Sequence, residues 1–238
     1  MTMLKNRWFS AVCLLLVCTL CFVFFTAPPA ISVFSYDNLN QPALILDAGH
    51  GGIDGGAVSA DGTVESQLNL QITRRLFSLF LFLGHETILT RTGEGDLSSP
   101  DAESIKEQKV SDLHARVKLI NGYENAVVIS IHQNMLPGHP TVRGAQVFYN
   151  RITPAEELAA TMQQSLNRTV NSKDRVYKAI DPGVFLMKEV RHPAVLVECG
   201  FLSSPSEAAL LSDSSYQKQL AAAIAAGFLQ FHTKEGAI

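Results

Sequence analysis

Hydrophobic residues follow two alternating patterns along residues 43–238. Short apolar runs typical of buried strands alternate with longer amphipathic stretches typical of helices. Strands are predicted at 43–47, 86–90, 126–131, 144–149, 184–187 and 194–198. Helices are predicted at 65–83 and 112–121, and others begin near 154, 204 and 214. This alternation predicts a single α/β domain containing a mostly parallel mixed sheet with helices on both faces.

Local signals mark the expected ends of the helices. Three segments have the spacing of a capping box, in which side chains satisfy free amides at a helix start: 153–156, 204–207 and 214–217. Pro154 suits the first helical position. Gly122 is expected at the left-handed position that ends a helix. The polar stretch 92–111 is expected to be a surface loop.

The N-terminal segment has a different pattern, because no charged residue occurs from Trp8 to Tyr36 and its first part is almost wholly apolar. About 20 apolar residues in a helix span the hydrocarbon layer of a membrane. Lys5 and Arg7 precede this run and indicate the cytoplasmic side. We therefore expect four parts: a cytoplasmic stub (1–7), a signal-anchor transmembrane helix (8–27), a linker (28–42) and an extracytoplasmic domain (43–238). A cleaved signal peptide ending near 26–30 is the alternative.

Composition narrows the class of protein. Of the 238 residues, 47% are hydrophobic and 17% charged, which is enough apolar material for a packed core. The formal net charge of −3 argues against a nucleic-acid partner, because such proteins carry a basic surplus. Three of the four cysteines lie in the predicted membrane segment. Cys199 is then alone in the outer domain, so the core and not a disulfide must hold that domain together.

Residues able to carry chemistry follow three of the predicted strands. His50 lies in a glycine-rich loop after the first strand, His132 follows the strand 126–131, and Glu198 ends the strand 194–198. Open α/β sheets bind ligands beyond the carboxyl ends of their strands. Glu65 begins the helix after the glycine-rich loop, which returns it toward His50. We therefore expect these four side chains to meet at one edge of the sheet.

Two histidines and a glutamate form a ligand set for Zn²⁺ that leaves a fourth position open for water. We expect His50, Glu65 and His132 to hold one zinc ion, because the first turn of a helix favours an ionised carboxylate at Glu65. Glu198 ends an apolar strand, where burial raises a carboxyl pKa toward neutrality. That property suits a general base acting on water.

Each residue also has an ordinary structural interpretation. A histidine after a strand fits a loop, and Glu65 fits a favourable helix start. Glu198 fits a buried carboxylate paired with Arg91 or Arg116. The glycines of residues 49–56 fit a tight turn, and they lack the spacing of a phosphate-binding loop. Strand alternation points Cys199 away from Glu198, so we expect this cysteine in the core and not as a nucleophile.

A family resemblance rests on four segments in order: LILDAGHGGIDGGA, ESQLNL, SIHQN and VLVECGFLSS. Over about residues 43–232 the chain resembles the zinc-dependent N-acetylmuramoyl-L-alanine amidases of bacterial cell walls. The resemblance implies hydrolysis of the amide that joins the lactyl group of muramic acid to L-alanine in peptidoglycan. It places His50, Glu65 and His132 at the family's zinc ligands and Glu198 at its catalytic glutamate. Asn134, two residues past His132, is a candidate substrate contact.

Further segments resemble the sporulation and germination branch of this family: RVKLIN, GVFLMKEV and GFLSSPSEAALL. That branch implies action on the spore cortex, as the first step toward muramic δ-lactam. It also implies a functional link to a muramic deacetylase and an accessory protein as partner. The alternatives are a general vegetative cell-wall amidase, a zinc peptidase acting on stem peptides, and a non-catalytic wall-binding module.

Overall fold

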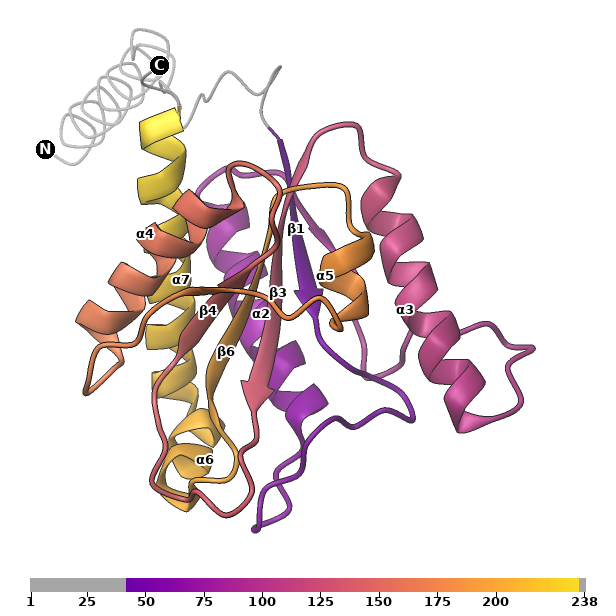
Figure 1. Cartoon of the computed structure of the whole chain (residues 1–238), viewed down its shortest axis with the longest axis horizontal. Coiled ribbons are helices and arrows are strands. Elements are labelled where there is room, and N and C mark those ends of the chain that lie inside the picture. The colour runs from indigo at the N-terminus through magenta and orange to yellow at the C-terminus, as the bar shows by residue number, and fades with distance from the viewer. Residues whose placement is uncertain (1–41, 236–238) are drawn as a thin grey trace, which may run out of the picture. The chain divides into compact units, whose positions relative to one another are not determined.

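The computed structural model describes residues 42–235, which are built around a six-stranded sheet of order β2-β1-β3-β6-β4-β5 (Figure 1). The strands are β1 (Ala43–Ala48), β2 (Thr87–Leu89), β3 (Ala126–Asn134), β4 (Gln146–Tyr149), β5 (Lys178–Ala179) and β6 (Ala194–Phe201). β1, β2, β3 and β6 are parallel, β4 runs antiparallel to β6, and β5 is parallel to β4. The predicted mostly parallel mixed sheet is confirmed.

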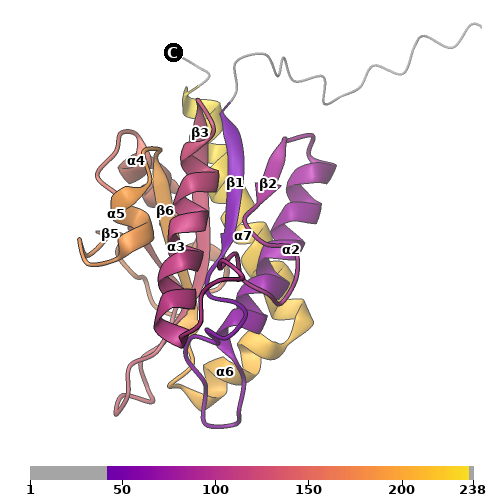
Figure 2. The same ribbon diagram turned by 90° about the vertical axis from the view of Figure 1, so that its right-hand side faces the viewer.

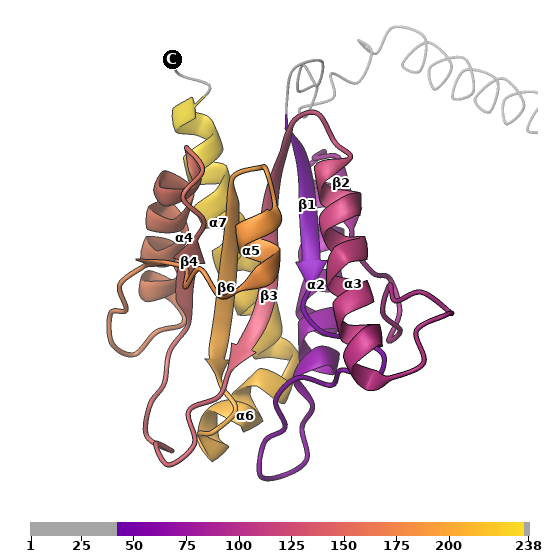
Figure 3. The same cartoon turned by 45° about the vertical axis from the view of Figure 1, so that its right-hand side comes forward.

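Helices cover both faces of the sheet, as predicted (Figure 3). They are α2 (Glu65–Phe82), α3 (Ile105–Asn121), α4 (Ala155–Thr169), α5 (Phe185–Glu189), α6 (Pro205–Ser212) and α7 (Ser214–Glu235). Side chains of α2, α4, α6 and α7 share one buried apolar cluster with the sheet, and those of α3 and α5 share the other. The carboxyl ends of β1, β3 and β6 point to the same end of the domain, where the loop after β1 lies (Figures 1 and 2).

The predicted stub and signal-anchor, and all of the linker except its last residue, lie outside the described residues. No helix within residues 42–235 is long and apolar enough to cross a membrane.

Two element predictions are wrong. Residues 184–187, predicted as a strand, lie largely in α5, a short helix that buries Leu186 and Met187 against the sheet. A run this short fits both periodicities, so packing decides between them. The predicted loop 92–111 ends early, because Ser104 and Glu107 form a reciprocal capping box that starts α3 at Ile105.

The predicted helix caps also need correction. Gly122 ends α3 in the right-handed conformation. None of the three predicted capping boxes forms as expected: Pro154 caps α4 without a side-chain bond, and Ser204 makes no capping bond to α6. Asp213 in place of Ser214 accepts the first amides of α7. Two of these segments have the right spacing, but their last side chains bond elsewhere: Glu207 accepts from Gly144 N and Phe201 N, and Gln217 bonds to Arg75 and Gln71.

Candidate metal centre and active site

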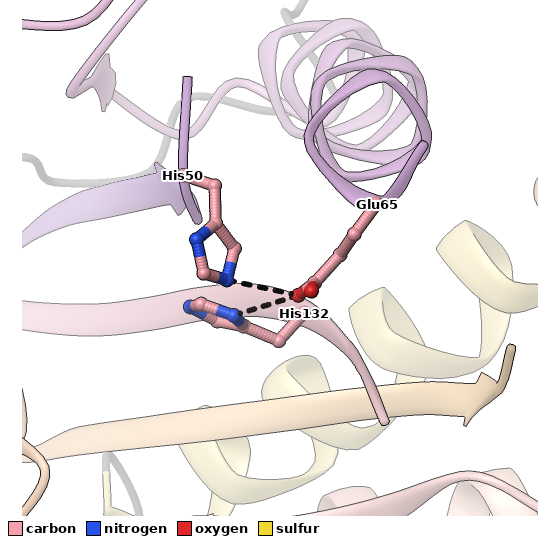
Figure 4. A group of neighbouring side chains, drawn as sticks. All are labelled: His50, Glu65 and His132. Carbon is pink, nitrogen blue, oxygen red and sulfur yellow. Dashed lines mark hydrogen bonds and ion pairs between the residues drawn. The ribbon is translucent and has the colours of Figure 1, made fainter. Parts of the chain in front are cut away.

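The structure brings His50, Glu65 and His132 together at the carboxyl edge of the sheet (Figure 4). The two histidines point at one carboxylate oxygen: His50 Nε2 lies 3.2 Å from Glu65 Oε1, and His132 Nδ1 lies 3.1 Å from it. One ligand atom from each residue lies within 4.8 Å of the others. Three donors this close, drawn from β1's loop, α2 and β3, have the chemistry of a metal site.

Two glycines leave the room that these side chains occupy. A Cβ atom on Gly49 would lie 2.2 Å from the Cε1 and Nε2 atoms of His132. A Cβ atom on Gly56 would lie 2.6 Å from Glu65 Oε2 and 2.8 Å from His50 Cδ2. The glycine-rich loop is therefore more than a turn, because it lets the backbone approach all three clustered residues.

The backbone at His50 is unusual. Its φ of 59° lies in the left-handed region that side chains other than glycine rarely adopt. The side chain is held there by Asp54, whose Oδ2 lies 2.8 Å from His50 Nδ1. Lys109 on α3 pairs in turn with Asp54 at 2.8 Å. A carboxylate on Nδ1 leaves Nε2 as the nitrogen that faces Glu65, an arrangement common around metal-bound histidines.

Electrostatics set the charges of the cluster without a metal. Burial would raise the pKa of Glu65, but hydrogen bonds and charges of His132 and His50 outweigh it and hold the pKa well below its usual range. Burial would lower the pKa of His50, but Glu65 and Asp54 raise it to about 9. Without a metal, His50 is therefore protonated on both ring nitrogens at neutral pH. A metal that binds Nε2 must displace the proton on that nitrogen.

Glu198 lies beside this cluster. It pairs directly with His132 across the parallel strands β6 and β3, and strand alternation places both side chains on the same face. Burial, the largest influence, raises the pKa of Glu198 to about 7. Its Oε2 atom is buried and has no hydrogen-bond partner. A buried, unpartnered carboxyl that titrates near neutrality can both take and return a proton.

Neither arginine of the alternative interpretation pairs with Glu198. The side chain of Arg91 donates to main-chain carbonyls, including those of Ala48 and Gly49. Arg116 forms ion pairs with Asp47 and Asp112 instead. Cys199 is fully buried in the core cluster on the opposite face, where strand alternation predicted it.

A buried network beneath the His50 loop was not predicted. The Asp47 carboxylate accepts hydrogen bonds from Thr90 (2.7 Å), Ser130 (2.6 Å) and Arg116 (2.7 Å). Burial would raise the pKa of Asp47, but Arg116 and these hydroxyls lower it to about 2. Arg116 also donates to the carbonyl oxygen of His50 at 2.7 Å. The network therefore fixes the backbone that carries the first histidine. A charged residue ending an apolar strand was the only sequence signal for it.

A pocket of about 250 Å³ lies next to His50 and His132. Its apolar wall comes from α3, α5 and β6 and includes Leu113, Phe185 and Leu196. Asn134 ends β3 at the same edge, half-buried, and its carbonyl accepts from Leu202 N at 2.8 Å. A substrate contact by Asn134 stays a prediction.

Comparison with known proteins adds the family. The profile described as N-acetylmuramoyl-L-alanine amidase matches residues 44–230. The chain belongs to the N-acetylmuramoyl-L-alanine amidase family. The family resemblance of the sequence is thereby confirmed, together with N-acetylmuramoyl-L-alanine amidase activity on peptidoglycan.

Three relatives are similar to this amidase over most of its length. The germination-specific N-acetylmuramoyl-L-alanine amidase of Bacillus subtilis is 36% identical over 198 residues, which are 83% of each chain. The CwlD amidase from Clostridioides difficile, solved in complex with the GerS lipoprotein, is 35% identical with a TM-score of 0.77, covering 81% of this chain and 99% of that one. An N-acetylmuramoyl-L-alanine amidase from Clostridium difficile 630 is 30% identical with a TM-score of 0.71, covering 82% and 98%.

Proposed function

We propose that this amidase is zinc-dependent and that it cuts the bond between the muramic lactyl group and L-alanine in spore-cortex peptidoglycan. The observation that carries the zinc assignment is the convergence of His50, Glu65 and His132, with ligand atoms within 4.8 Å of one another. The donor set fits zinc, which prefers histidine nitrogen and carboxylate oxygen in fourfold coordination with one open position. Bound there, zinc supplies a Lewis acid for the amide carbonyl and for water.

The chain's own residues supply the proton transfers. Glu198 Oε2 has no partner in the described residues, so it is free to accept a proton from the attacking water. Glu198 then delivers that proton to the amide nitrogen as the carbon–nitrogen bond breaks. The products are a carboxyl group on the lactyl side and a peptide stem that begins with the free amine of L-alanine. We assign Asn134 to the substrate side of the same edge.

Two relatives support a proposal for the cellular setting. A B. subtilis relative is named germination-specific, and the C. difficile CwlD structure contains the GerS lipoprotein. We propose that residues 8–27 anchor the amidase in the membrane with its catalytic domain on the extracytoplasmic side. An accessory protein and a muramic deacetylase then act with it, and the amidase step precedes δ-lactam formation.

Fragment masses test this function. The full-length protein is incubated with cortex and with vegetative peptidoglycan, each with zinc and each with a chelator. The proposal expects stems that begin with L-alanine and muramic acid without peptide, from cortex, with zinc only. Release that survives the chelator would overturn the zinc assignment. Equal release from vegetative wall would favour a general wall amidase, and addition of a muramic deacetylase should yield δ-lactam.

A further inference from the structure

A second polar group lies beside Glu198, on the side away from the metal cluster. Gln146 of β4 is directly opposite Glu198 of β6, and side chains directly opposite in an antiparallel pair share one face. Arg175 Nη2 lies 3.5 Å from Gln146 Oε1. Because the strands run in the order β1-β3-β6-β4, the groups form a row across the sheet edge: His50, His132, Glu198, and then Gln146 with Arg175.

The position of Arg175 is fixed by its surroundings. Its backbone amide donates to Asn167 Oδ1 at 3.1 Å, and its carbonyl accepts from Asn167 Nδ2 at 2.9 Å. Its side chain passes Gly144, where an added Cβ would lie 3.3 Å from Arg175 Cγ. Its guanidinium carbon lies 5.2 Å from the centre of the Phe201 ring. An arginine held at so many points is ready to bind without further ordering.

The guanidinium nevertheless lacks an acidic partner. Its Nε atom is buried without a hydrogen bond, and Arg175 forms no ion pair with any carboxylate of residues 42–235. The charge of Arg175 acts on the nearby carboxylate of Glu207. The two oxygens of Glu207, however, accept hydrogen bonds from Gly144 N and Phe201 N at 2.8 Å each. A half-buried arginine without an acid fits a carboxylate supplied by a ligand, because the planar fork binds carboxylates through two bonds.

We propose that Arg175 binds a free carboxylate of the peptide stem, which makes it a specificity residue of this amidase. The inference rests on the proposed function, in which Glu198 protonates the departing nitrogen, so that the peptide leaves on the Glu198 side of the metal cluster. Neighbouring strands lie about 4.8 Å apart. Gln146 stands one such spacing beyond Glu198, and Arg175 contacts its side chain, so the stem must extend past L-alanine to reach the guanidinium. Extended residues advance about 3.3 Å each, which is less than one strand spacing, so we assign the carboxylate to the second or third stem residue.

The test compares muramoyl-peptide substrates that differ in one group. The full-length, zinc-loaded protein is given the free-acid peptide, the same peptide amidated at the second residue, and the one amidated at the third. We expect one of the two amidations to lower kcat/KM by about tenfold to a hundredfold, the range for hydrogen bonds to charged groups. Arg175→Gln should cleave all three peptides at the lower rate, and Arg175→Lys should restore part of the preference.

Controls separate recognition from damage to the fold. Arg151→Gln removes one positive charge from an exposed arginine beyond the other end of β4 and should keep the wild-type preference. Zinc content and melting temperature should match in all variants. Equal cleavage of the three peptides by the wild type, or a preference kept by Arg175→Gln, would overturn the proposal.

Failure of the proposed function would look different, because the wild type would then release no stem from any of the three substrates. Calorimetric binding of the free-acid and amidated stems still decides the role of Arg175 in that case. Tighter binding of the free acid that Arg175→Gln abolishes would support it, and equal affinities would contradict it.

Discussion

The replacement Gly49→Ala tests whether close backbone approach shapes the metal site. Gly49 is not among the glycines with positive φ, so its backbone conformation accepts an alanine. The added Cβ would nevertheless stand 2.2 Å from two atoms of the His132 ring. The backbone cannot yield easily, because Gly49 N donates to Ile131 O at 3.0 Å and Gly49 O accepts from Arg91 and Asn69, each at 3.1 Å. The ring of His132 must therefore move.

The size of that movement follows from the contact distances. Ordinary van der Waals contact begins at 3.4 Å, so the ring must retreat by about 1.2 Å, the difference between 3.4 and 2.2 Å. Zinc sites tolerate deviations of about 0.2 Å in ligand distance. His132 Nδ1, now 3.1 Å from Glu65 Oε1, would then no longer share a site with the other two ligands. Loss of second-shell support alone costs about 10- to 100-fold in metal affinity, so displacing a ligand should cost at least about 100-fold.

The assay is competition for zinc against a fluorescent chelator, with thermal melting in excess chelator to follow the metal-free fold. Gly93→Ala is the matched control, because its backbone φ is ordinary and an added Cβ there meets no atom within 4 Å. We expect Gly49→Ala to lose zinc affinity and amidase activity together, while Gly93→Ala keeps both. Wild-type zinc affinity in Gly49→Ala would refute the steric reasoning.

Four further predictions concern three carboxylates in and around the site. Asp54→Ala should weaken zinc binding about 10- to 100-fold in the chelator assay, because His50 loses the acceptor that orients it; unchanged affinity would contradict this role. Glu198→Gln should keep zinc but lower kcat by about 10²- to 10⁴-fold. The ionised form of Glu198 is the base, so wild-type kcat/KM should rise with pH. The rise should level off at or below about pH 7, because a bound cation lowers the pKa of a neighbouring carboxyl. A profile that falls over this range would contradict the role of Glu198 as the base. In the folded protein the pKa of Asp47 is about 2, below its ordinary value of 3.8. The ionised Asp47 therefore stabilises the fold by about 2 kcal/mol above pH 4, and this contribution is lost as the pH falls from 4 to 2. Urea unfolding in chelator should show that loss in the wild type, and Asp47→Asn should flatten it.

Much of the site was predictable because its residues stand at the ends of strands. Apolar runs located β1, β3 and β6, and parallel strands bring their carboxyl ends to one edge. His132 and Glu198 consequently lie on facing positions of the sheet. Glu65 was predictable because the helix after the glycine loop had to return along β1. These inferences needed only local periodicity and the geometry of parallel sheets.

Other residues of the site were not predictable. Asp54 stands four residues after His50, and the two side chains meet in the folded loop, where His50 has a left-handed backbone. The sequence does not predict that backbone conformation. The network of Asp47 and Arg116 joins residues 69 apart. Sequence spacing carries no record of such contacts. For the same reason it does not show that Glu207 accepts from the backbone amides of Gly144 and Phe201 and does not cap α6.

The sequence by itself determined the strands, most helices, the class of sheet and the four residues expected to carry the chemistry. It did so because periodicity and helix signals depend on residues within a few positions of one another. Only the tertiary structure decided how close Gly49 comes to His132, which acids orient the histidines, and where Arg175 lies. Those features depend on packing between segments that are distant in the chain, and close packing fixes them to fractions of an ångström.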